Sequence, residues 1–399
     1  MPEISIRGME MPESPIRKLA PLAAAAKKRG TKVYHLNIGQ PDLPTPQCGL
    51  DALKNIDRSV LEYSPSQGYL SYREKLVDFY AKYNIHVTAD DIIITAGGSE
   101  AVLFAFLSCL NPGDEIIIPE PAYANYMAFA ISAGAVIRTI ATTIEEGFSL
   151  PKVEKFEELI NERTRAILIC NPNNPTGYLY TRREMNQIRD MVKKYDLYLF
   201  SDEVYREYIY TGSPYISACH LEGIEQNVVL IDSVSKRYSE CGIRIGALIT
   251  KNEKIREAVM KLCQARLSPP LIGQIVAEAS LDAPEEYYRD VYEEYVERRK
   301  CLIDGLNRIH GVYSPIPMGA FYTVAKLPVD DSEKFCRWCL EEFDYEGETI
   351  MMAPAAGFYT TPGAGINQVR IAYVLKKKDL ERALIILEKA LETYPGRVD

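Results

Sequence analysis

The chain has 399 residues, of which 47% are hydrophobic, and a formal net charge of −9 at pH 7. This length and composition predict a globular protein with a large core, which we expect to divide into two domains. Acidic and basic residues are mixed without a long basic stripe, which argues against nucleic acid as a partner. No apolar run is long enough for a membrane span, and residues 1–17 lack the apolar core of a signal peptide. We therefore expect a cytoplasmic protein that contacts no membrane.

Short apolar runs alternate with amphipathic segments through the middle of the chain. Runs of this length are typical of buried strands, and the amphipathic segments between them are typical of helices. This alternation favours a mostly parallel sheet with helices on both faces, because parallel crossovers carry helices. The predicted strands are 91–95, 115–119, 136–140, 166–170, 198–201, 228–231 and 245–250, and the predicted helices are 100–110, 123–133, 152–160 and 183–195.

The pattern changes after Ala283, where Pro284 opens a long charged helix that is predicted to reach about Asn307. The elements predicted beyond it are a strand at 319–327, a helix at 332–343, a strand at 368–373 and a helix at 378–393. This order indicates a smaller α+β domain. The predicted division is an N-terminal segment, 1–44, associated with the small domain, a large domain, 45–284, and a small domain, 285–399.

One lysine, Lys236, lies in a short polar turn between two of the apolar runs. Ser233 and Ser235 precede it, and Arg244 follows it. A lysine at a strand end, with hydroxyls and a guanidinium suited to a phosphate, fits a Schiff base to pyridoxal phosphate. The turn therefore predicts an enzyme of amino-acid chemistry.

A glycine turn, Gly97-Gly98-Ser99, ends one predicted strand and opens a helix. Glycines let the backbone come close to a ligand, and a helix N-terminus offers free N–H groups to a phosphate. A plain turn with a helix cap explains the same residues, so the turn alone assigns no phosphate site. The absence of a G-x-G-x-x-G or Walker-type motif argues against a dinucleotide or a nucleoside triphosphate.

Asp202 ends another predicted strand and Tyr205 follows it. The carboxyl ends of strands line the ligand crevice of an open parallel sheet. A carboxylate there could pair with a protonated pyridine nitrogen, and the tyrosine could bond the phenolic oxygen of the cofactor. Taken singly, Asp202 also reads as a helix cap and Tyr205 as a core residue.

Three more polar residues stand out for similar reasons. Asn174, in a turn with two Asn-Pro steps, could donate to an anionic ring oxygen, and Tyr123 could lie over a flat ligand. Arg370 lies within an otherwise apolar strand, and its guanidinium suits a carboxylate, with an internal salt bridge as the alternative. The four histidines lie far apart, near no paired carboxylates or thiols, so no metal site is predicted.

Together these motifs resemble the fold-type I pyridoxal-phosphate aminotransferases of class I/II, the aspartate aminotransferase family. The likeness extends from Asn37-Ile-Gly39-Gln-Pro-Asp42 to Arg370. The order in which these motifs follow one another is highly specific. It runs from the glycine turn through the tyrosine, Asn-Pro-Thr-Gly, Asp-x-x-Tyr and Ser-x-Ser-Lys to the two arginines. The resemblance implies an α/β fold, with a mostly parallel central sheet flanked by helices and a smaller α+β domain.

The resemblance also implies roles for these residues. Lys236 would bind the cofactor as a Schiff base and carry the proton between the substrate α-carbon and the cofactor. Asp202 would hold the pyridine nitrogen protonated, while Tyr205 and Asn174 would bind the ring oxygen. The phosphate would be held by Gly98, Ser99, Ser233, Ser235 and Arg244, with Tyr63 reaching the phosphate of the neighbouring subunit.

On the substrate side, the resemblance places Tyr123 on the cofactor ring and Arg370 on the substrate α-carboxylate. Gly39 would close over the substrate from the N-terminal segment. The implied partners are an amino acid, a 2-oxo acid and a second copy of the chain in a homodimer with shared sites.

One departure concerns substrate choice. Some bacterial aspartate-specific relatives carry a lysine right after the Gly-Gly turn, where this chain has Ser99. The leading prediction is an aspartate aminotransferase-like enzyme that uses 2-oxoglutarate by a ping-pong mechanism. Aromatic, alanine or prephenate amino-group exchange stays open, as does a lyase or decarboxylase on the same scaffold. A ligand-sensing module is disfavoured, because no helix-turn-helix extension precedes the core.

Overall fold

Seven strands form the central sheet of the larger part of the molecule, in the order β2-β8-β7-β6-β5-β3-β4. The computed structural model describes residues 2–212 and 214–398. Strands β3 to β7 pair in parallel, whereas β8 is antiparallel to both of its neighbours, so the predicted mostly parallel sheet is confirmed. The strands are β2 (Ile92–Thr95), β3 (Glu115–Glu120), β4 (Val136–Ala141), β5 (Thr164–Cys170), β6 (Tyr198–Asp202), β7 (Val228–Ser233) and β8 (Gly246–Ile249).

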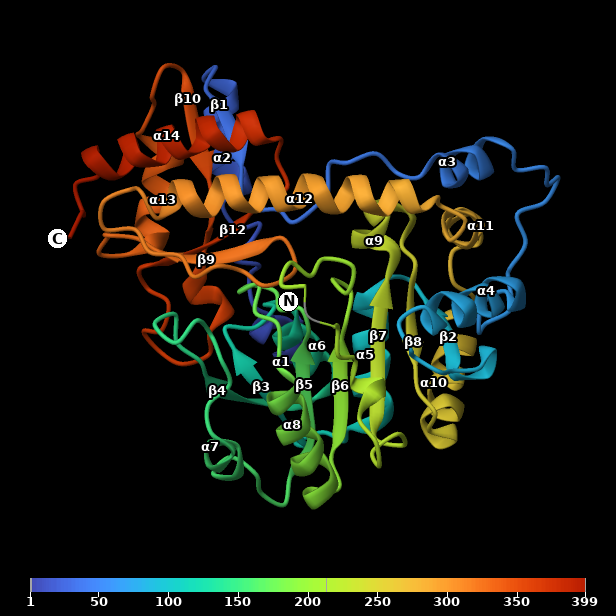
Figure 1. Cartoon of the computed structure of the whole chain (residues 1–399). Helices are drawn as coiled ribbons and strands as arrows, with labels where there is room; N and C mark the ends of the chain where they lie inside the picture. The colour runs from blue at the N-terminus through green and yellow to red at the C-terminus, as the bar shows by residue number, and fades with distance from the viewer. Residues whose placement is uncertain (1, 213, 399) are drawn as a thin grey trace.

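The sheet is buried on both faces, which explains the continuous apolar runs of its strands. In β3, Ile116 and Ile118 belong to one core with Phe106, while Ile117 belongs to another with Ile188. Successive side chains of a strand point to opposite faces, so each run supplies both cores at once. Figure 1 shows this sheet in the lower half of the molecule, with helices packed around it.

Helices pack on both faces of this sheet. Helices α5 and α10 contribute to the core with Ile116, and α8 contributes to the core with Ile117. The helices are α3 (Gln47–Lys54), α4 (Leu70–Ala81), α5 (Gly98–Cys109), α6 (Asn125–Ala133), α7 (Val153–Glu157), α8 (Arg182–Tyr195), α9 (Val234–Arg237), α10 (Glu253–Arg266) and α11 (Leu271–Ser280), with short 3-10 turns at Ala89–Asp91, Ala218–His220 and Cys241–Ile243.

The smaller part is reached through the long helix α12, which crosses the molecule above the sheet (Figure 1). It contains a three-stranded antiparallel sheet, β11-β12-β9, and a two-stranded parallel sheet in which β1 pairs with β10. The elements are α2 (Ala20–Lys28), β1 (Lys32–His35), α12 (Glu285–Leu306), β9 (Tyr322–Lys326), α13 (Ser332–Glu341), β10 (Glu348–Met351), β11 (Ala353–Pro354), a 3-10 turn (Ala355–Phe358), β12 (Gln368–Ala372) and α14 (Lys377–Thr393). The short first helix, α1 (Ile6–Glu10), lies instead beside α6 of the larger part (Figure 1).

The N-terminal segment packs with the C-terminal elements. Leu19, Val33 and Leu36 share one core with Leu302 of α12 and Leu387 of α14. These three residues of the N-terminal segment thus share a core with elements of the smaller part. The predicted assignment of residues 1–44 to the small domain, and the division at 44 and 284, stay predictions.

Two predicted elements differ from the structure. The helix predicted at 152–160 is a single short helix, Val153–Glu157. The polar turn at Lys236 is a one-turn helix, α9, capped by the Ser233 hydroxyl, which accepts from the Ser235 amide. Serine is a favoured N-cap because its oxygen satisfies a free N–H of the first turn, so the hydroxyl has a structural role there too.

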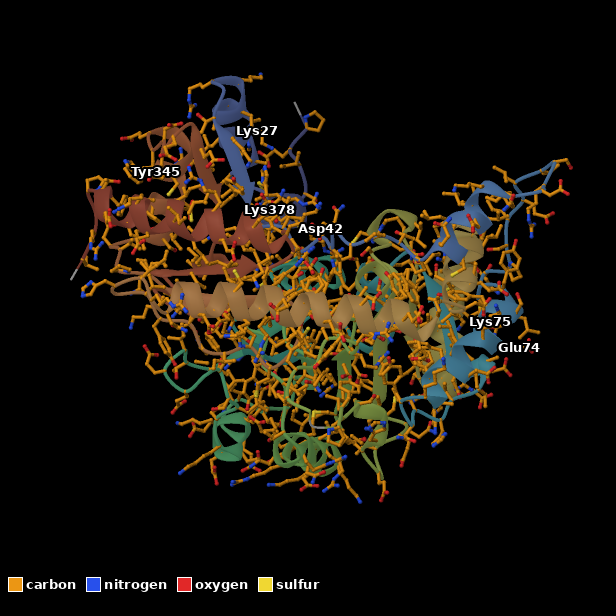
Figure 2. The ribbon with its side chains drawn as sticks, turned by 45° about the horizontal axis from the view of Figure 1, so that its top comes forward. Lys27, Asp42, Glu74, Lys75, Tyr345 and Lys378 are labelled. Atoms are coloured by element: carbon orange, nitrogen blue, oxygen red, sulfur yellow. The ribbon has the colours of Figure 1, made fainter. Side chains whose placement is uncertain are left out.

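Charged side chains lie on the outside of both parts, as Figure 2 shows for Glu74 and Lys75 in the larger part and Lys27 and Lys378 in the smaller part. Over the described ranges, no helix combines the length and the apolar character that a membrane crossing needs. The same residues contain no group of three or more His, Cys, Asp or Glu arranged to hold a metal ion.

Candidate active site

The residues singled out in the sequence lie where strands of the central sheet end. Asp202 and Ser233 are the last residues of β6 and β7, and Asn174 follows the end of β5. Tyr123 follows β3 in the same way. Because β3, β5, β6 and β7 are parallel, their carboxyl ends meet at one edge, which is where open α/β sheets bind ligands.

Lys236 reaches from α9 to the N-terminal segment. Its Nζ donates to the carbonyl oxygen of Gly39 at 2.9 Å and lies 3.9 Å from the Cys241 Sγ. The carbonyl oxygen of Lys236 accepts a hydrogen bond of 2.6 Å from the Tyr208 hydroxyl. The Tyr208 hydroxyl thus holds the backbone of the lysine, while the amine of the lysine contacts the segment that carries Gly39.

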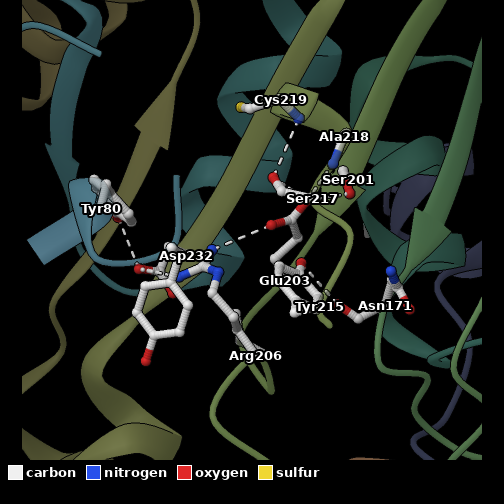
Figure 3. A network of polar contacts seen from close by, with 12 residues as sticks. Tyr80, Asn171, Ser201, Glu203, Arg206, Tyr215, Ser217, Ala218, Cys219 and Asp232 are labelled. Atoms are coloured by element: carbon white, nitrogen blue, oxygen red, sulfur yellow. Dashed lines mark hydrogen bonds and ion pairs between the residues drawn. The ribbon is translucent and has the colours of Figure 1, made fainter. Parts of the chain in front are cut away.

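A buried network of charges anchors α9 next to the lysine. Arg237 binds Asp232 at 2.6 Å and Glu207 at 2.8 Å. Arg206 lies between Glu203, at 3.3 Å, and Asp232, at 3.5 Å, and the Tyr80 hydroxyl donates to Asp232 (Figure 3). Breaking a buried ion pair leaves an uncompensated charge and is costly, so the network restricts the positions that α9 can take.

The glycine turn, Arg244 and two serines converge beside α5. A Cβ at Gly97, where φ is +87°, would collide with the Arg244 guanidinium, so this arginine lies directly on the turn. The Ser233 hydroxyl donates to that of Ser235 at 2.9 Å, and Gly98 opens α5 near Ser233. No side chain caps the N-terminus of α5, which leaves its N–H groups and its positive dipole end for an anion.

Asp202 is buried, and no cation of residues 2–212 or 214–398 forms an ion pair with it. Its Oδ2 accepts a hydrogen bond of 2.6 Å from Tyr126, and its Oδ1 accepts from the Val204 amide at 3.4 Å. Burial raises the pKa of Asp202 from 3.8 to about 6, and the Tyr126 hydrogen bond opposes this only in part. A positive group beside this carboxylate would bring the pKa back down.

Asn174, Tyr205 and Tyr322 form a chain of hydrogen bonds. The Asn174 Nδ2 donates to the Tyr205 hydroxyl at 3.2 Å, and that hydroxyl lies 3.1 Å from the Tyr322 hydroxyl. A Cβ at Gly39 would collide with the Tyr322 hydroxyl, so only a glycine fits this approach of the N-terminal segment. Burial raises the pKa of Tyr205 well above its usual value, so the phenol stays protonated.

Arg370 is fully buried and has no acidic partner. It donates to the Asn174 Oδ1 at 3.2 Å and to the Asn37 carbonyl, and its Nε bonds to nothing in the described residues. Its cation lies over the rings of Tyr322, at 4.7 Å, and Phe358, at 5.0 Å. Burial lowers the pKa of this guanidinium, since only polar and aromatic groups surround it. The internal salt bridge that was the alternative is therefore absent from the part of the chain that the structure describes.

The structure thus brings together most of the predicted residues. Tyr123 lies beside Tyr126, with ring centroids 5.3 Å apart, and so reaches the neighbourhood of Asp202. Ser99 is the second residue of α5. Tyr63 is the outlier, with 75% of its surface exposed, and its role toward a neighbouring subunit stays a prediction.

Three residues of the site escaped the sequence reasoning. Tyr126 could have been found, because it follows Tyr123 by one helical turn. Tyr208 and Tyr322 carry no such signal, since the chain contains 27 tyrosines and Tyr322 is 117 residues from Tyr205.

The family model for aminotransferases of class I and II matches residues 31–387 of the chain. The chain belongs to this family. The match spans both parts of the molecule and every predicted site residue, so the fold and the general activity, amino-group transfer, follow from it.

The relatives of this aminotransferase are named for different substrates. It is 34% identical to an aspartate aminotransferase of Pyrococcus horikoshii over 90% of this chain and 91% of that protein. It is 30% identical to aromatic-amino-acid aminotransferase 2 of Thermococcus litoralis over 95% of this chain and 96% of that protein. The solved structure of Thermus thermophilus aspartate aminotransferase with maleate superposes with a TM-score of 0.89, at 27% identity, over 98% of this chain and all of that one.

Proposed function

We propose that the protein is a pyridoxal-phosphate-dependent aminotransferase that moves an amino group from an L-amino acid to a 2-oxo acid. The observation that carries this proposal is the fully buried Arg370, which has no acidic partner and an unbonded Nε. A buried guanidinium in this state calls for a carboxylate, and the α-carboxylate is the group that all amino acids and 2-oxo acids share.

The residues around Lys236 suit the cofactor. The uncapped N-terminus of α5, with Arg244 on its glycine turn and the hydroxyls of Ser233 and Ser235 nearby, forms a cradle for a phosphate. Asp202 is a buried carboxylate without a cation, as the partner of a protonated pyridine nitrogen would be. Tyr205 and Asn174 offer hydrogen-bond donors for the ring oxygen.

When bound, the pyridine ring would supply an electron sink for the pair released at the substrate α-carbon. Lys236 would take the proton from the α-carbon with its Nζ and deliver it to the cofactor carbon C4′. Asp202 would keep the ring nitrogen protonated, and Arg370 would orient the substrate through its carboxylate. Gly39 and Tyr322 exclude water from the side of the N-terminal segment.

An aspartate-like enzyme with 2-oxoglutarate as acceptor is the form of this proposal that we favour. Its support is that relatives over nearly the whole chain are named aspartate aminotransferases. Aromatic, alanine and prephenate substrates are the alternatives within transamination, and a lyase or decarboxylase is the alternative outside it.

A panel of amino donors with 2-oxoglutarate tests the proposal. We expect glutamate to form in proportion to donor consumed, with double-reciprocal plots parallel as in a ping-pong cycle. Arg370→Ala is expected to raise the KM for every donor by about 100-fold, because truncating one partner of a buried charge pair costs about 2–5 kcal/mol.

The same panel separates the alternatives. Ammonia or carbon dioxide released without formation of glutamate would establish the lyase or decarboxylase instead. Arg370→Lys is the matched control, since it keeps the charge but loses the bidentate contact, and we expect an intermediate KM. An effect of Arg370→Ala on one donor only would contradict the role in binding the α-carboxylate.

We also propose a homodimer with shared active sites in the cytoplasm. One stretch of the chain carries large apolar side chains that are exposed, and exposed apolar surface of this kind favours an interface. These side chains are Leu53, Val60, Leu61, Tyr63 and Leu70. All nine cysteines are free, which suits a reducing compartment.

Light scattering is expected to report twice the 45.0 kDa chain mass, and Val60→Glu to shift this toward the monomer with loss of activity. Ile385→Glu, at another exposed apolar position, on α14, is the control and should leave the dimer intact. A fully active 45.0 kDa monomer would exclude the shared site.

A further inference from the structure

A turn in the N-terminal segment lies against the elements that surround Arg370. In this turn the amides of Arg17 and Lys18 donate to the Ser14 carbonyl, at 3.0 and 2.9 Å. The Asn37 Nδ2 donates to the Ile16 carbonyl at 2.7 Å, and the Asn37 carbonyl in turn accepts from Arg370. Asn37 therefore joins the turn to the candidate site of the α-carboxylate.

A second contact fixes the same turn from the other side. A Cβ at Gly357 would collide with Pro15, so the turn packs directly on the 3-10 turn that contains Phe358. The ring of Phe358 lies 5.0 Å from the Arg370 cation. The turn is thus bound to two groups that both contact Arg370.

Arg17 is the residue of this turn whose charged side chain is available to bind a ligand. Its side chain is exposed and makes no hydrogen bond or ion pair within residues 2–212 and 214–398. Its neighbour Lys18, by contrast, binds Glu333 at 2.5 Å.

Arg17 also acts electrostatically on the cofactor side of the site. Burial raises the pKa of Tyr123 to about 12, and Arg370 and Arg17 are the two cations that act against this rise. Arg370 is the cation that we assign to the α-carboxylate, whereas Arg17 has no such assignment. Ser99 leaves this chain without the lysine that some aspartate-specific relatives carry after the glycine turn.

We propose that Arg17 binds the distal carboxylate of dicarboxylic substrates, namely aspartate, glutamate and 2-oxoglutarate. The proposal rests on the proposed aminotransferase function and names the substrate class of that site. The α-carboxylate occupies Arg370, and the second carboxylate meets the Arg17 guanidinium, which suits a bidentate contact. Neutral substrates do not need this contact.

The test compares Arg17→Gln with the wild type in the cofactor-loaded protein. We expect kcat/KM for aspartate and for 2-oxoglutarate to fall about 10- to 100-fold, as for loss of a hydrogen bond to a charged group. For alanine with pyruvate, kcat/KM should stay within about twofold of the wild type, because this pair has no second carboxylate to lose. Arg17→Lys, which keeps the charge, should recover part of the loss.

Succinate gives a readout that needs no turnover, because it has two carboxylates and no amino group. Its inhibition constant should rise with Arg17→Gln by a factor similar to the change in kcat/KM, while that of acetate should not change. Lys28→Gln is the matched control, an exposed cation on α2 of the same segment, and should behave as the wild type.

Three results would overturn the role of Arg17. These are unchanged kinetics with dicarboxylic substrates, an equal loss with alanine, or a wild type that accepts no dicarboxylic substrate at all. Each leaves the aminotransferase function intact as long as the wild type transfers amino groups between other substrates. If the wild type transfers none, the proposed function itself fails.

Discussion

Lys236→Ala is expected to lower the rate of amino-group transfer by about 10⁴-fold, the upper end of what a positioned acid–base group contributes. In the proposed mechanism the Lys236 amine moves the proton, and among the described residues no other lysine donates to the Gly39 carbonyl oxygen. The fold should persist, because α9 is held by Arg237, Asp232 and Glu207 rather than by the lysine side chain.

The measurement is the rate of glutamate formation together with the visible absorbance of the bound cofactor. Both should disappear in Lys236→Ala while the thermal midpoint stays near that of the wild type. Lys251→Ala, an exposed lysine just after β8, serves as the control and should leave both unchanged. Full activity in Lys236→Ala would refute the mechanism.

Asp202→Asn is expected to have opposite effects on activity and on the stability of the cofactor-free protein. The pKa of Asp202 is raised from 3.8 to about 6 by burial, so the folded state binds the proton more tightly than the unfolded state. The free energy of unfolding therefore decreases as pH rises from about 4 to about 6, and the loss stays complete above that range. A shift of this size corresponds to at most about 3 kcal/mol.

The variant lacks this titration and should gain stability relative to the wild type above pH 6, while its activity falls because the ring nitrogen loses its anionic partner. Thermal midpoints of the cofactor-free proteins between pH 4.5 and 8 give the difference curve. Added cofactor should stabilise the wild type more than the variant at pH 8. Asp78→Asn, at an exposed position on α4, is the control and should show no such pH dependence. A flat difference curve would show that Asp202 is not a buried acid of raised pKa.

Much of the central sheet was predictable because each strand is buried on both faces. The run Glu115–Glu120 needs no knowledge of its partners to be recognised, since Ile116, Ile117 and Ile118 must all leave water. The site residues followed for a related reason, because polar groups directly after such runs have to lie at the carboxyl edge of the sheet. Asp202, Asn174 and Ser233 were found in this way.

Other parts of the site could not be predicted, because they depend on contacts between distant segments. The sequence around Lys236 reads as a polar turn, and only the cap from Ser233 and the ion pairs of Arg237 make it helical. Nothing near Tyr322 indicates that it meets Tyr205 and Gly39. Such contacts are decided by the packing of the small domain and the N-terminal segment on the sheet.

The sequence by itself determined the kind of chemistry, because Lys236, Asp202 and Arg370 supply an amine, a carboxyl group and a guanidinium in any fold. Only the tertiary structure decided whether these groups are left without partners. Arg370 lacks an acid and Asp202 lacks a cation because burial removed both from water without pairing them within the described residues. That state is a property of the packing, and it is what prepares the site for a charged cofactor and substrate.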